Sequence, residues 1–192
     1  MPTAAPPPPS VHDHAIARLS VEQYHAMIRS GVLTGDDRVE LIDGYLVDKM
    51  PKSPRHAKAV RRLAAALRDA LPDGLTAIKE DPITLAGSEP EPDVAVVTDE
   101  SLDRGDAHPA AADCRLVVEV AETTLAEDRG RAAVYAAAGI PEYWIVNLLT
   151  GEIERYFEPS PDGYAATASG AVADLKIDGR GRIEVNIATL VD

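Results

Sequence analysis

The sequence predicts a single α/β (or α+β) domain with a mixed central β-sheet flanked by helices and an extra β-hairpin region at the C-terminus. The length of 192 residues suits one domain with a substantial hydrophobic core. Strand and helix candidates alternate through the middle of the chain and strands dominate its end, an order typical of a mixed sheet. Two candidates, residues 94–97 and 116–120, are almost continuously apolar, as central strands covered on both faces are.

The chain begins with a segment that we expect to be disordered. Residues 1–17 include the run Pro6–Pro9, which favours extended polyproline geometry, and they offer little to bury. The single folded domain is therefore expected over residues 18–192. Its first helix should follow Ser20, which forms a capping box with the glutamine three residues later, and should end at Gly31.

A β-hairpin and an amphipathic helix come next. Residues 38–47 predict the hairpin, because two short apolar runs flank the turn signal Asp43-Gly44. The helix is predicted over 54–71, where apolar residues recur at helical spacing and basic residues occupy the opposite face. The apolar set is Val60, Leu63, Ala64, Leu67 and Leu71, and the basic set is Arg55, Lys58 and Arg62.

The remaining elements complete the sheet. Residues 75–79 predict a strand, with an extension to Leu85 left open, and 142–148 predict another buried strand. Between the two central strands, the polar stretch 98–113 indicates a loop or a short helix. A helix is predicted over 128–138, closed by a glycine. Further strands are expected at 153–157, 164–168 and 183–187, the first two as a hairpin.

Composition excludes several classes of protein. The single cysteine, Cys114, rules out a disulfide framework and a cysteine-rich zinc site. The chain has no run of 18 or more apolar residues, so we expect no membrane-spanning helix. Its start lacks the pattern of a secretory signal, so we expect a cytoplasmic protein.

The charge is unevenly distributed. The formal net charge of −13 argues against a protein that coats nucleic acid, because phosphate binding draws on Lys and Arg. The stretch from Lys49 to Arg68, however, contains no Asp or Glu. This basic segment is either a solvated helix face or a surface that contacts nucleic acid. The residues that we tentatively assign to nucleic-acid binding are Lys52, Arg55, His56, Lys58 and Arg62.

Three acidic residues stand where strands normally place apolar side chains. Glu40 lies within 39–42, Asp93 directly precedes the strand at 94–97, and Glu119 lies within 116–120. A carboxylate in a central strand is costly to bury unless it is paired or binds a metal. Strand alternation places Glu119 on the same face as Ala121, whose small side chain leaves space beside it.

Clustered carboxylates of this kind are typical of a magnesium site. Bound Mg²⁺ relieves their mutual repulsion, prefers oxygen ligands and takes one or two carboxylates together with waters and a phosphate. We expect Asp93 and Glu119 to be direct ligands, and Glu40 to be an outer ligand or a water-orienting base. The alternative is an edge-strand position or an ion pair with a nearby arginine.

Five segments around these residues resemble the Uma-two family of restriction endonucleases, within the PD-(D/E)XK nuclease superfamily. They occur in the family's order and together cover about residues 20–160. The segments are Val39-Glu-Leu-Ile-Asp-Gly44, Pro51-Lys-Ser-Pro-Arg-His56, Ser88-Glu-Pro-Glu-Pro-Asp-Val-Ala95, Leu116-Val-Val-Glu-Val120 and Tyr135-Ala-Ala-Ala-Gly-Ile-Pro-Glu-Tyr-Trp-Ile-Val146.

The resemblance implies a restriction-endonuclease-like core that hydrolyses phosphodiester bonds in DNA. It implies dependence on Mg²⁺, for which Mn²⁺ should substitute, and it gives the catalytic acidic roles to Glu40, Asp93 and Glu119. A homodimer would fit this activity, because cutting both strands of a duplex usually requires two sites. The alternative is a catalytically weakened nuclease-fold protein that acts as a nucleic-acid-binding or regulatory module.

The chain departs from the superfamily pattern at one functional position. The superfamily places a lysine two residues after the second acid, where this chain has Ala121. The family usually moves that lysine to the following helix, and there Arg131 lies nearest to its position. An arginine can neutralise charge in the transition state but is too basic to transfer protons, so we assign Arg131 a stabilising role.

Several other residues have more ordinary interpretations. His56 either contacts a phosphate or a metal-bound water, or it packs at the start of its helix. Glu89 and Glu91 are expected to be loop carboxylates, with Glu91 close enough to Asp93 to serve as a fourth ligand. Trp144, Tyr135, Tyr143 and Cys114 are expected to pack in the core.

Overall fold

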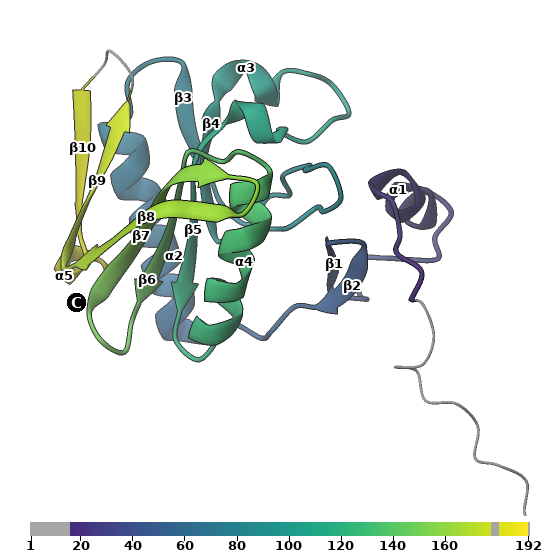
Figure 1. The fold of residues 1–192 in the computed structure, drawn as a ribbon, viewed down its shortest axis with the longest axis horizontal. Helices are drawn as coiled ribbons and strands as arrows, with labels where there is room; N and C mark the ends of the chain where they lie inside the picture. Colours follow the sequence, from purple (N-terminus) through teal and green to yellow (C-terminus); the bar gives the residue numbers. More distant parts are fainter. Residues whose placement is uncertain (1–15, 178–180, 192) are drawn as a thin grey trace, which may run out of the picture.

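The computed structural model describes residues 16–177 and 181–191. The disorder predicted for the N-terminal arm falls on residues 1–15 and thus lies outside the described residues, except at positions 16 and 17. The described chain is arranged around one six-stranded sheet, with smaller two-stranded sheets on either side of it (Figure 1).

The central sheet has the strand order β3-β4-β5-β6-β7-β8. Neighbouring strands run antiparallel except β5 and β6, which are parallel, so the predicted mixed sheet is confirmed. Strands β4 and β5 lie side by side in the interior of the sheet and are buried almost throughout, as their apolar sequences predict. The strands are β3 (Leu75–Ile78), β4 (Val94–Thr98), β5 (Cys114–Ala121), β6 (Glu142–Asn147), β7 (Glu152–Ser160) and β8 (Gly163–Gly170).

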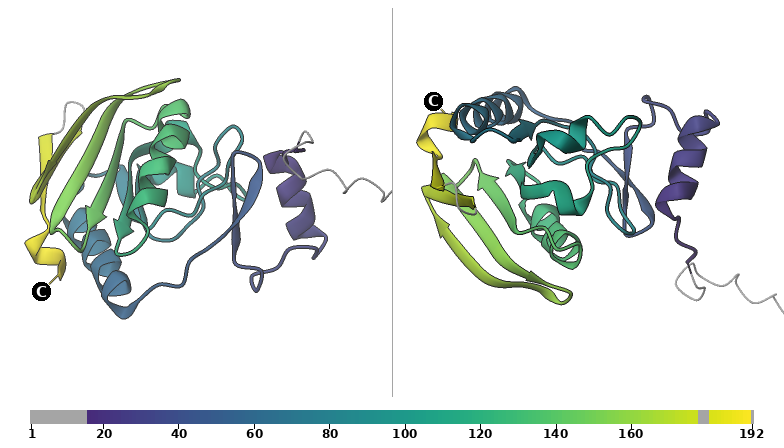
Figure 2. Two further views of the ribbon diagram at one scale, coloured as in Figure 1. Left: turned by 60° about the horizontal axis from the view of Figure 1, so that its bottom comes forward. Right: turned by 90° about the horizontal axis from the view of Figure 1, so that it is seen from above.

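Two helices cover opposite faces of this sheet, as the view from above shows (Figure 2). Helix α2 (Pro54–Ala70) packs its apolar stripe, including Leu63 and Leu67, against side chains such as Val118 on one face. Helix α4 (Leu125–Ala137) covers the other face, where Tyr135 packs with residues such as Tyr143. Because each face is covered by a helix, the strand positions between them are buried, which makes a carboxylate there costly.

The N-terminal lobe consists of helix α1 (Val21–Arg29) and the hairpin of β1 (Val39–Ile42) and β2 (Tyr45–Asp48). Ser20 caps α1 with the predicted capping box, and the hairpin turns at Asp43 and Gly44, both with positive φ. The hairpin is a separate sheet that lies beside the central one (Figure 1). A β-bridge between Leu41 and Glu89 connects it to the rest of the structure.

The C-terminal hairpin pairs β9 (Val172–Ile177) with β10 (Gly181–Asn186) and leads into the short helix α5 (Ala188–Val191). The predicted late strand corresponds to β10, whereas sequence analysis missed β9. The sequence of β9 does alternate, and its residues Ala173, Leu175 and Ile177 are buried on the core formed with α2. The hairpin therefore extends the hydrophobic layer beneath α2 beyond the central sheet.

The predicted start of one helix was wrong, and the extension that was left open for one strand does not form. Helix α4 begins at Leu125, three residues before the expected start, because the stretch after Thr124 has good helix formers and the Asp128 N–H bonds the Thr124 carbonyl at 2.9 Å. Strand β3 ends at Ile78 and does not extend to Leu85. The chain leaves the strand at Glu80, whose φ of 57° takes it out of strand geometry.

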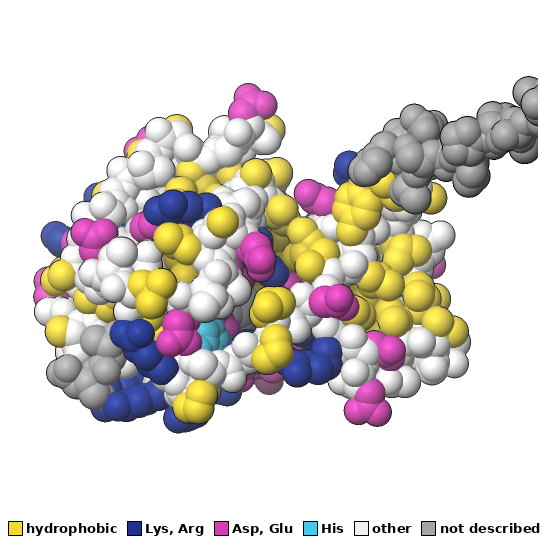
Figure 3. All heavy atoms as spheres, turned by 90° about the horizontal axis from the view of Figure 1, so that it is seen from below, with side chains coloured by type: hydrophobic (Ala, Val, Ile, Leu, Met, Phe, Trp, Pro, Cys, Tyr) yellow, Lys and Arg dark blue, Asp and Glu magenta, His cyan; other side chains and the backbone are white. Residues whose placement is uncertain are grey.

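The polar stretch between β4 and β5 contains the short helix α3 (Asp99–Leu102) and the 3₁₀ turn η2 (Ala111–Asp113), as predicted. No helix among residues 16–177 and 181–191 is long and apolar enough to cross a membrane. Viewed from below, acidic and basic side chains are interspersed over the main body, and hydrophobic side chains gather on the N-terminal lobe at the right (Figure 3).

The turn of the β1–β2 hairpin should tolerate no side chain at position 44. A Cβ on Gly44 would lie 2.6 Å from the Arg18 Cβ and 2.9 Å from the Leu19 carbonyl oxygen, in a backbone with φ of 79°. We expect Gly44→Ala to lower the free energy of unfolding by about 2 kcal/mol or more, combining the left-handed backbone with overpacking.

The matched control is Gly151→Ala, which has a similar φ of 72° and no atom within 4 Å of the added Cβ. It should cost only about 1 kcal/mol, the cost of the backbone conformation alone. Urea unfolding of both variants measures the difference, and equal losses would contradict the close packing of Gly44 on residues 18 and 19.

Candidate metal centre

A cavity of about 500 Å³ opens between the β1–β2 hairpin, the start of α2, the start of β4 with the end of β5, and the first turns of α4. It brings together residues that are far apart in the sequence. Its lining includes all three acids that sequence analysis singled out and three basic side chains: Glu40, Asp93, Glu119, Lys52, His56 and Arg131.

Asp93 directly precedes β4, and its carboxylate is almost fully buried. Its Oδ2 accepts hydrogen bonds from the Val120 N–H at 2.8 Å and from His56 Nε2 at 2.9 Å, and its Oδ1 accepts one from Lys52 Nζ at 2.8 Å. Burial would raise the pKa of Asp93, but the His56 hydrogen bond and the Lys52 charge outweigh it and lower the pKa. Asp93 is therefore held as a carboxylate.

Glu119 lies in the middle of β5, on the same face as Val117 and Ala121, as strand alternation predicts. Its Oε2 accepts a long hydrogen bond from the Asp93 N–H at 3.3 Å, and its Oε1 accepts one from the Tyr135 hydroxyl at 3.1 Å. Burial, and then the nearby charge of Asp93, raise the pKa of Glu119 well above its ordinary value. The negative charge of this carboxylate is thus only partly compensated by the protein.

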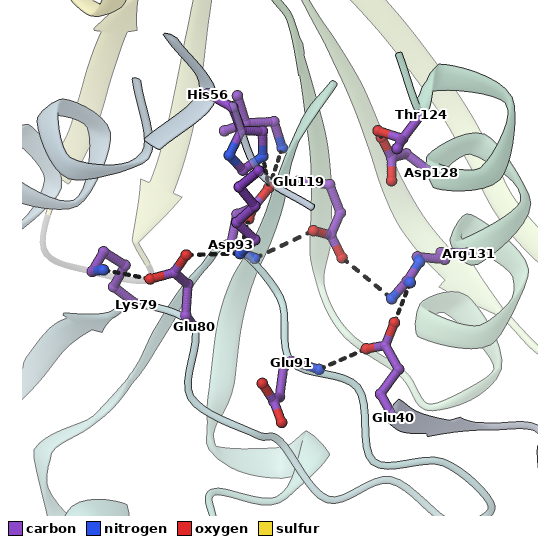
Figure 4. A network of polar contacts seen from close by, with 12 residues as sticks. Glu40, His56, Lys79, Glu80, Glu91, Asp93, Glu119, Thr124, Asp128 and Arg131 are labelled. Carbon is purple, nitrogen blue, oxygen red and sulfur yellow. Dashed lines mark hydrogen bonds and ion pairs between the residues drawn. The ribbon is translucent and has the colours of Figure 1, made fainter. Parts of the chain in front are cut away.

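Glu40 and Arg131 form the third part of the cavity wall. Arg131 extends from α4, forms an ion pair with Glu40 and approaches Glu119 Oε1 at 3.8 Å (Figure 4). The other oxygen of Glu40 accepts the Glu91 N–H at 3.0 Å. Although burial opposes the charge of Arg131, its hydrogen bond to Glu40 and the charge of Glu119 raise its pKa. Arg131 therefore lies against two of the three acids, in the region where the motif lysine was expected.

The three acids share one cavity but not one coordination sphere. Within the described part of the chain, no group of three or more His, Cys, Asp or Glu side chains is positioned to hold a metal ion. The cations of Lys52 and Arg131 bond Asp93 and Glu40, so the acids are paired within the protein. The predicted shared metal site of Glu40, Asp93 and Glu119 stays a prediction.

The tentative nucleic-acid contacts differ in burial and in their partners. Lys52 and His56 bond Asp93, and Arg55 donates to the Leu148 carbonyl at 2.7 Å. Lys58 is exposed on α2 and Arg62 is half-buried. Part of the basic segment therefore serves as counterions for the acidic cavity.

Two further polar residues, Tyr135 and Asp128, belong to this region. Tyr135 was predicted only as a packing residue but donates to Glu119. Asp128 lines the cavity; burial raises its pKa to about 6, although it accepts a hydrogen bond from the Thr124 hydroxyl at 2.7 Å. Asp128 could have been noticed as an acid within a helix facing the sheet, whereas the Tyr135 hydroxyl contact depends on tertiary structure that no local pattern reveals.

Two loop carboxylates differ in their environments. Glu91 lines the cavity and forms an ion pair with Lys49, in keeping with a loop carboxylate near the site. Glu89 also lies in this loop but is buried, and it bonds His25 Nε2 at 2.7 Å and the Thr84 hydroxyl at 2.8 Å. Glu89 thus ties α1 to the main body and lies outside the cavity. Asn147 accepts two backbone N–H bonds in the turn after β6.

Comparison with family models identifies the group to which the sequence belongs. A model described as "Uma2: Putative restriction endonuclease" matches residues 21–175, more than half of the chain. The chain belongs to the Uma2 family. The match includes all three cavity acids and Arg131, and it confirms the resemblance inferred from the five sequence segments. No curated protein matched the chain.

A solved structure supports the fold. The protein is similar to one described as "Crystal structure of a putative nuclease belonging to DUF820 from Anabaena variabilis ATCC 29413", with a TM-score of 0.67 and 12% sequence identity. The alignment covers 90% of this chain and 97% of the other. At this identity the likeness concerns the fold alone, and it agrees with the predicted restriction-endonuclease-like core.

The uncompensated burial of Glu119 should make the metal-free protein less stable at neutral pH. Because the folded-state pKa lies above the ordinary value of 4.5, the folded protein retains a proton that the unfolded chain has lost, so stability falls as pH rises above that value. Glu119→Gln should therefore raise the free energy of unfolding by about 1–2 kcal/mol at pH 7, and the gain should vanish towards pH 4.

Urea unfolding in EDTA across this pH range measures the effect. The control is Glu142→Gln in the neighbouring strand β6, because Glu142 is also buried but is paired with Arg155 at 3.0 Å and with the Trp144 indole N–H at 2.7 Å. Glu142→Gln should bring no gain. If the difference in free energy of unfolding between Glu119→Gln and the wild type did not change with pH, the buried charge of Glu119 would not be what destabilises the protein.

Proposed function

We propose that this protein is a metal-dependent endonuclease that hydrolyses phosphodiester bonds in DNA. The observation that carries the proposal is the placement of Asp93 and Glu119 at one cavity from two adjacent central strands, joined by the Asp93 N–H to Glu119 hydrogen bond. Family membership supports the same activity, since the description of the family is "Putative restriction endonuclease". Apolar residues at these two positions would stabilise the fold at least as well as two buried acids. Stability of the fold therefore does not explain why Asp93 and Glu119 are there.

The available donor atoms suit Mg²⁺, with Mn²⁺ as a substitute. Both central acids offer carboxylate oxygens, and the raised pKa of Glu119 shows that the protein alone would compensate its charge only partly. Asp93 and Glu119 would hold the ion directly, with Glu40 as an outer ligand or water-orienting base. A bound divalent ion would activate water and stabilise the charge that develops on the scissile phosphate.

The basic residues of the cavity have distinct roles in this proposal. Arg131 is fixed against Glu40 and lies 3.8 Å from Glu119, so its positive charge faces the place where a scissile phosphate would enter. An arginine stabilises phosphate charge but does not transfer protons. His56 holds Asp93 Oδ2 at 2.9 Å and so fixes the orientation of that carboxylate. Arg131 thus acts as a stabilising residue and His56 as a positioning residue.

DNA would approach along the start of α2. The exposed Lys58 and the half-buried Arg62 lie on this helix, whose first turn borders the cavity. The net charge of −13 makes broad, non-specific attraction to DNA weak, so binding would depend on this local basic surface. A homodimer would supply two cavities for the two strands of a duplex.

A non-cleaving nucleic-acid-binding or regulatory protein is the second candidate, favoured by one observation. Ala121 occupies the motif lysine position, and the nearest replacement, Arg131, is already paired with Glu40. Such a protein would bind Mn²⁺ and nucleic acid without turnover.

Cleavage assays on purified protein test the proposal. Plasmid and single-stranded DNA should be cut with Mg²⁺ or Mn²⁺ and left intact with EDTA. Asp93→Ala and Glu119→Ala should abolish cleavage, because each removes a direct ligand. Glu40→Gln should lower the rate about 10- to 100-fold, as loss of an outer partner typically does.

The control is Glu100→Ala, which removes an exposed acid of α3 outside the cavity and should cleave like the wild type. Circular dichroism checks that each variant is folded. Cleavage that is insensitive to both Asp93→Ala and Glu119→Ala would overturn the site assignment. Metal binding without cleavage of any substrate would favour the non-cleaving protein.

A further inference from the structure

We infer that Lys52 is a built-in counterion that occupies the metal-facing oxygen of Asp93 and must be displaced for a divalent cation to bind. The inference rests on the proposed function, since it concerns how the same cavity admits its metal. The sequence predicted Lys52 to be a nucleic-acid contact, and the family pattern predicted the cation that replaces the motif lysine on α4. The structure instead places the ammonium of Lys52 directly on the central acid.

The two oxygens of Asp93 are bonded differently. Oδ2 is fully engaged, because it accepts the Val120 N–H at 2.8 Å and His56 Nε2 at 2.9 Å. Oδ1 accepts from Lys52 Nζ at 2.8 Å. Because the Oδ2 contacts come from the β5 backbone and from a buried histidine, they persist when Oδ1 changes partner. Oδ1 is therefore the oxygen that can coordinate a cation, and Lys52 is the group that covers it.

Lys52 has a second partner that keeps it beside the cavity. Its Nζ lies 2.7 Å from Glu80 Oε1, and Glu80 is itself placed by a backbone bond from its N–H to the Asp93 carbonyl at 3.3 Å. Glu80 also pairs with Lys79 (Figure 4). When a cation binds Asp93 Oδ1, Lys52 can remain bonded to Glu80, where its charge would lie close to a substrate phosphate at the metal. The lysine would thus change from counterion to phosphate contact with little movement.

The two other Lys and Arg side chains that line the cavity do not have this role. Lys49 forms its ion pair with Glu91. Arg131 projects from the middle of α4, and its side chain is 21% exposed, against 36% for Lys52. Arg131 holds Glu40, the outer acid, and comes no closer than 3.8 Å to Glu119. Lys52 precedes α2 in an extended segment and can move its ammonium without disturbing a helix. Competition with the metal therefore falls on Lys52.

Calorimetry of the full chain with Mn²⁺ alone tests the inference. Lys52→Met should bind Mn²⁺ about 10-fold more tightly than the wild type, because the ion no longer has to displace a neighbouring positive charge from the carboxylate. Lys52→Arg, which retains the positive charge, should bind like the wild type. Cleavage by Lys52→Met should nevertheless be slower than wild type at saturating metal, since the phosphate contact is lost.

Lys79→Met is a closely matched control. Lys79 contacts the same Glu80 and has the same 36% exposure, but no hydrogen bond or ion pair joins it to Asp93 among the described residues. The Lys79→Met variant measures how much the metal affinity rises when any nearby positive charge is lost. We expect it to change the affinity no more than about twofold. Equal affinities for Lys52→Met and Lys79→Met would overturn the counterion role while leaving the proposed metal site intact. Absence of Mn²⁺ binding in every variant would overturn both.

Discussion

The hydrogen bonds that Asp93 receives from the Val120 N–H and from His56 are the contacts on which the rest of the cavity depends. They bury a carboxylate at the start of β4 and align it with the adjacent strand β5, where Glu119 lies. Two buried acids held this close repel each other, and basic and hydroxyl groups lie around them. Lys52 comes from the loop before α2, and Arg131 and Tyr135 both come from α4, yet all three contact this pair.

The central part of this arrangement could be predicted from the sequence. The uninterrupted apolar runs of β4 and β5 identify buried strands, and a glutamate inside one of them stands out because nothing local explains it. Likewise, the Asp43-Gly44 pair predicts its hairpin because few residues adopt positive φ. Each of these features can be recognised from a single short segment of the sequence.

The features that escaped prediction depend on contacts between distant segments. Lys52 looks like part of a basic surface until Asp93, far along the chain, is placed beside it. Glu89 looks like an ordinary loop acid until α1 brings His25 to it. Strand β9 has the right alternation, but its burial depends on α2 and the C-terminal hairpin packing together. A local pattern can show that a residue is unusual at its position. The residue that it contacts depends on how distant segments are arranged in the fold.

The separation of the β1–β2 hairpin from the central sheet has a consequence for how the family can diversify. Glu40 and the nearby wall of the cavity come from residues 39–50, while Asp93 and Glu119 come from the central strands. The wall of the cavity is therefore encoded in two separate stretches of chain. Changes at hairpin positions other than Glu40 can reshape the entrance while β4 and β5 stay as they are. The shape and charge of the entrance can thus vary while all three acids keep their places.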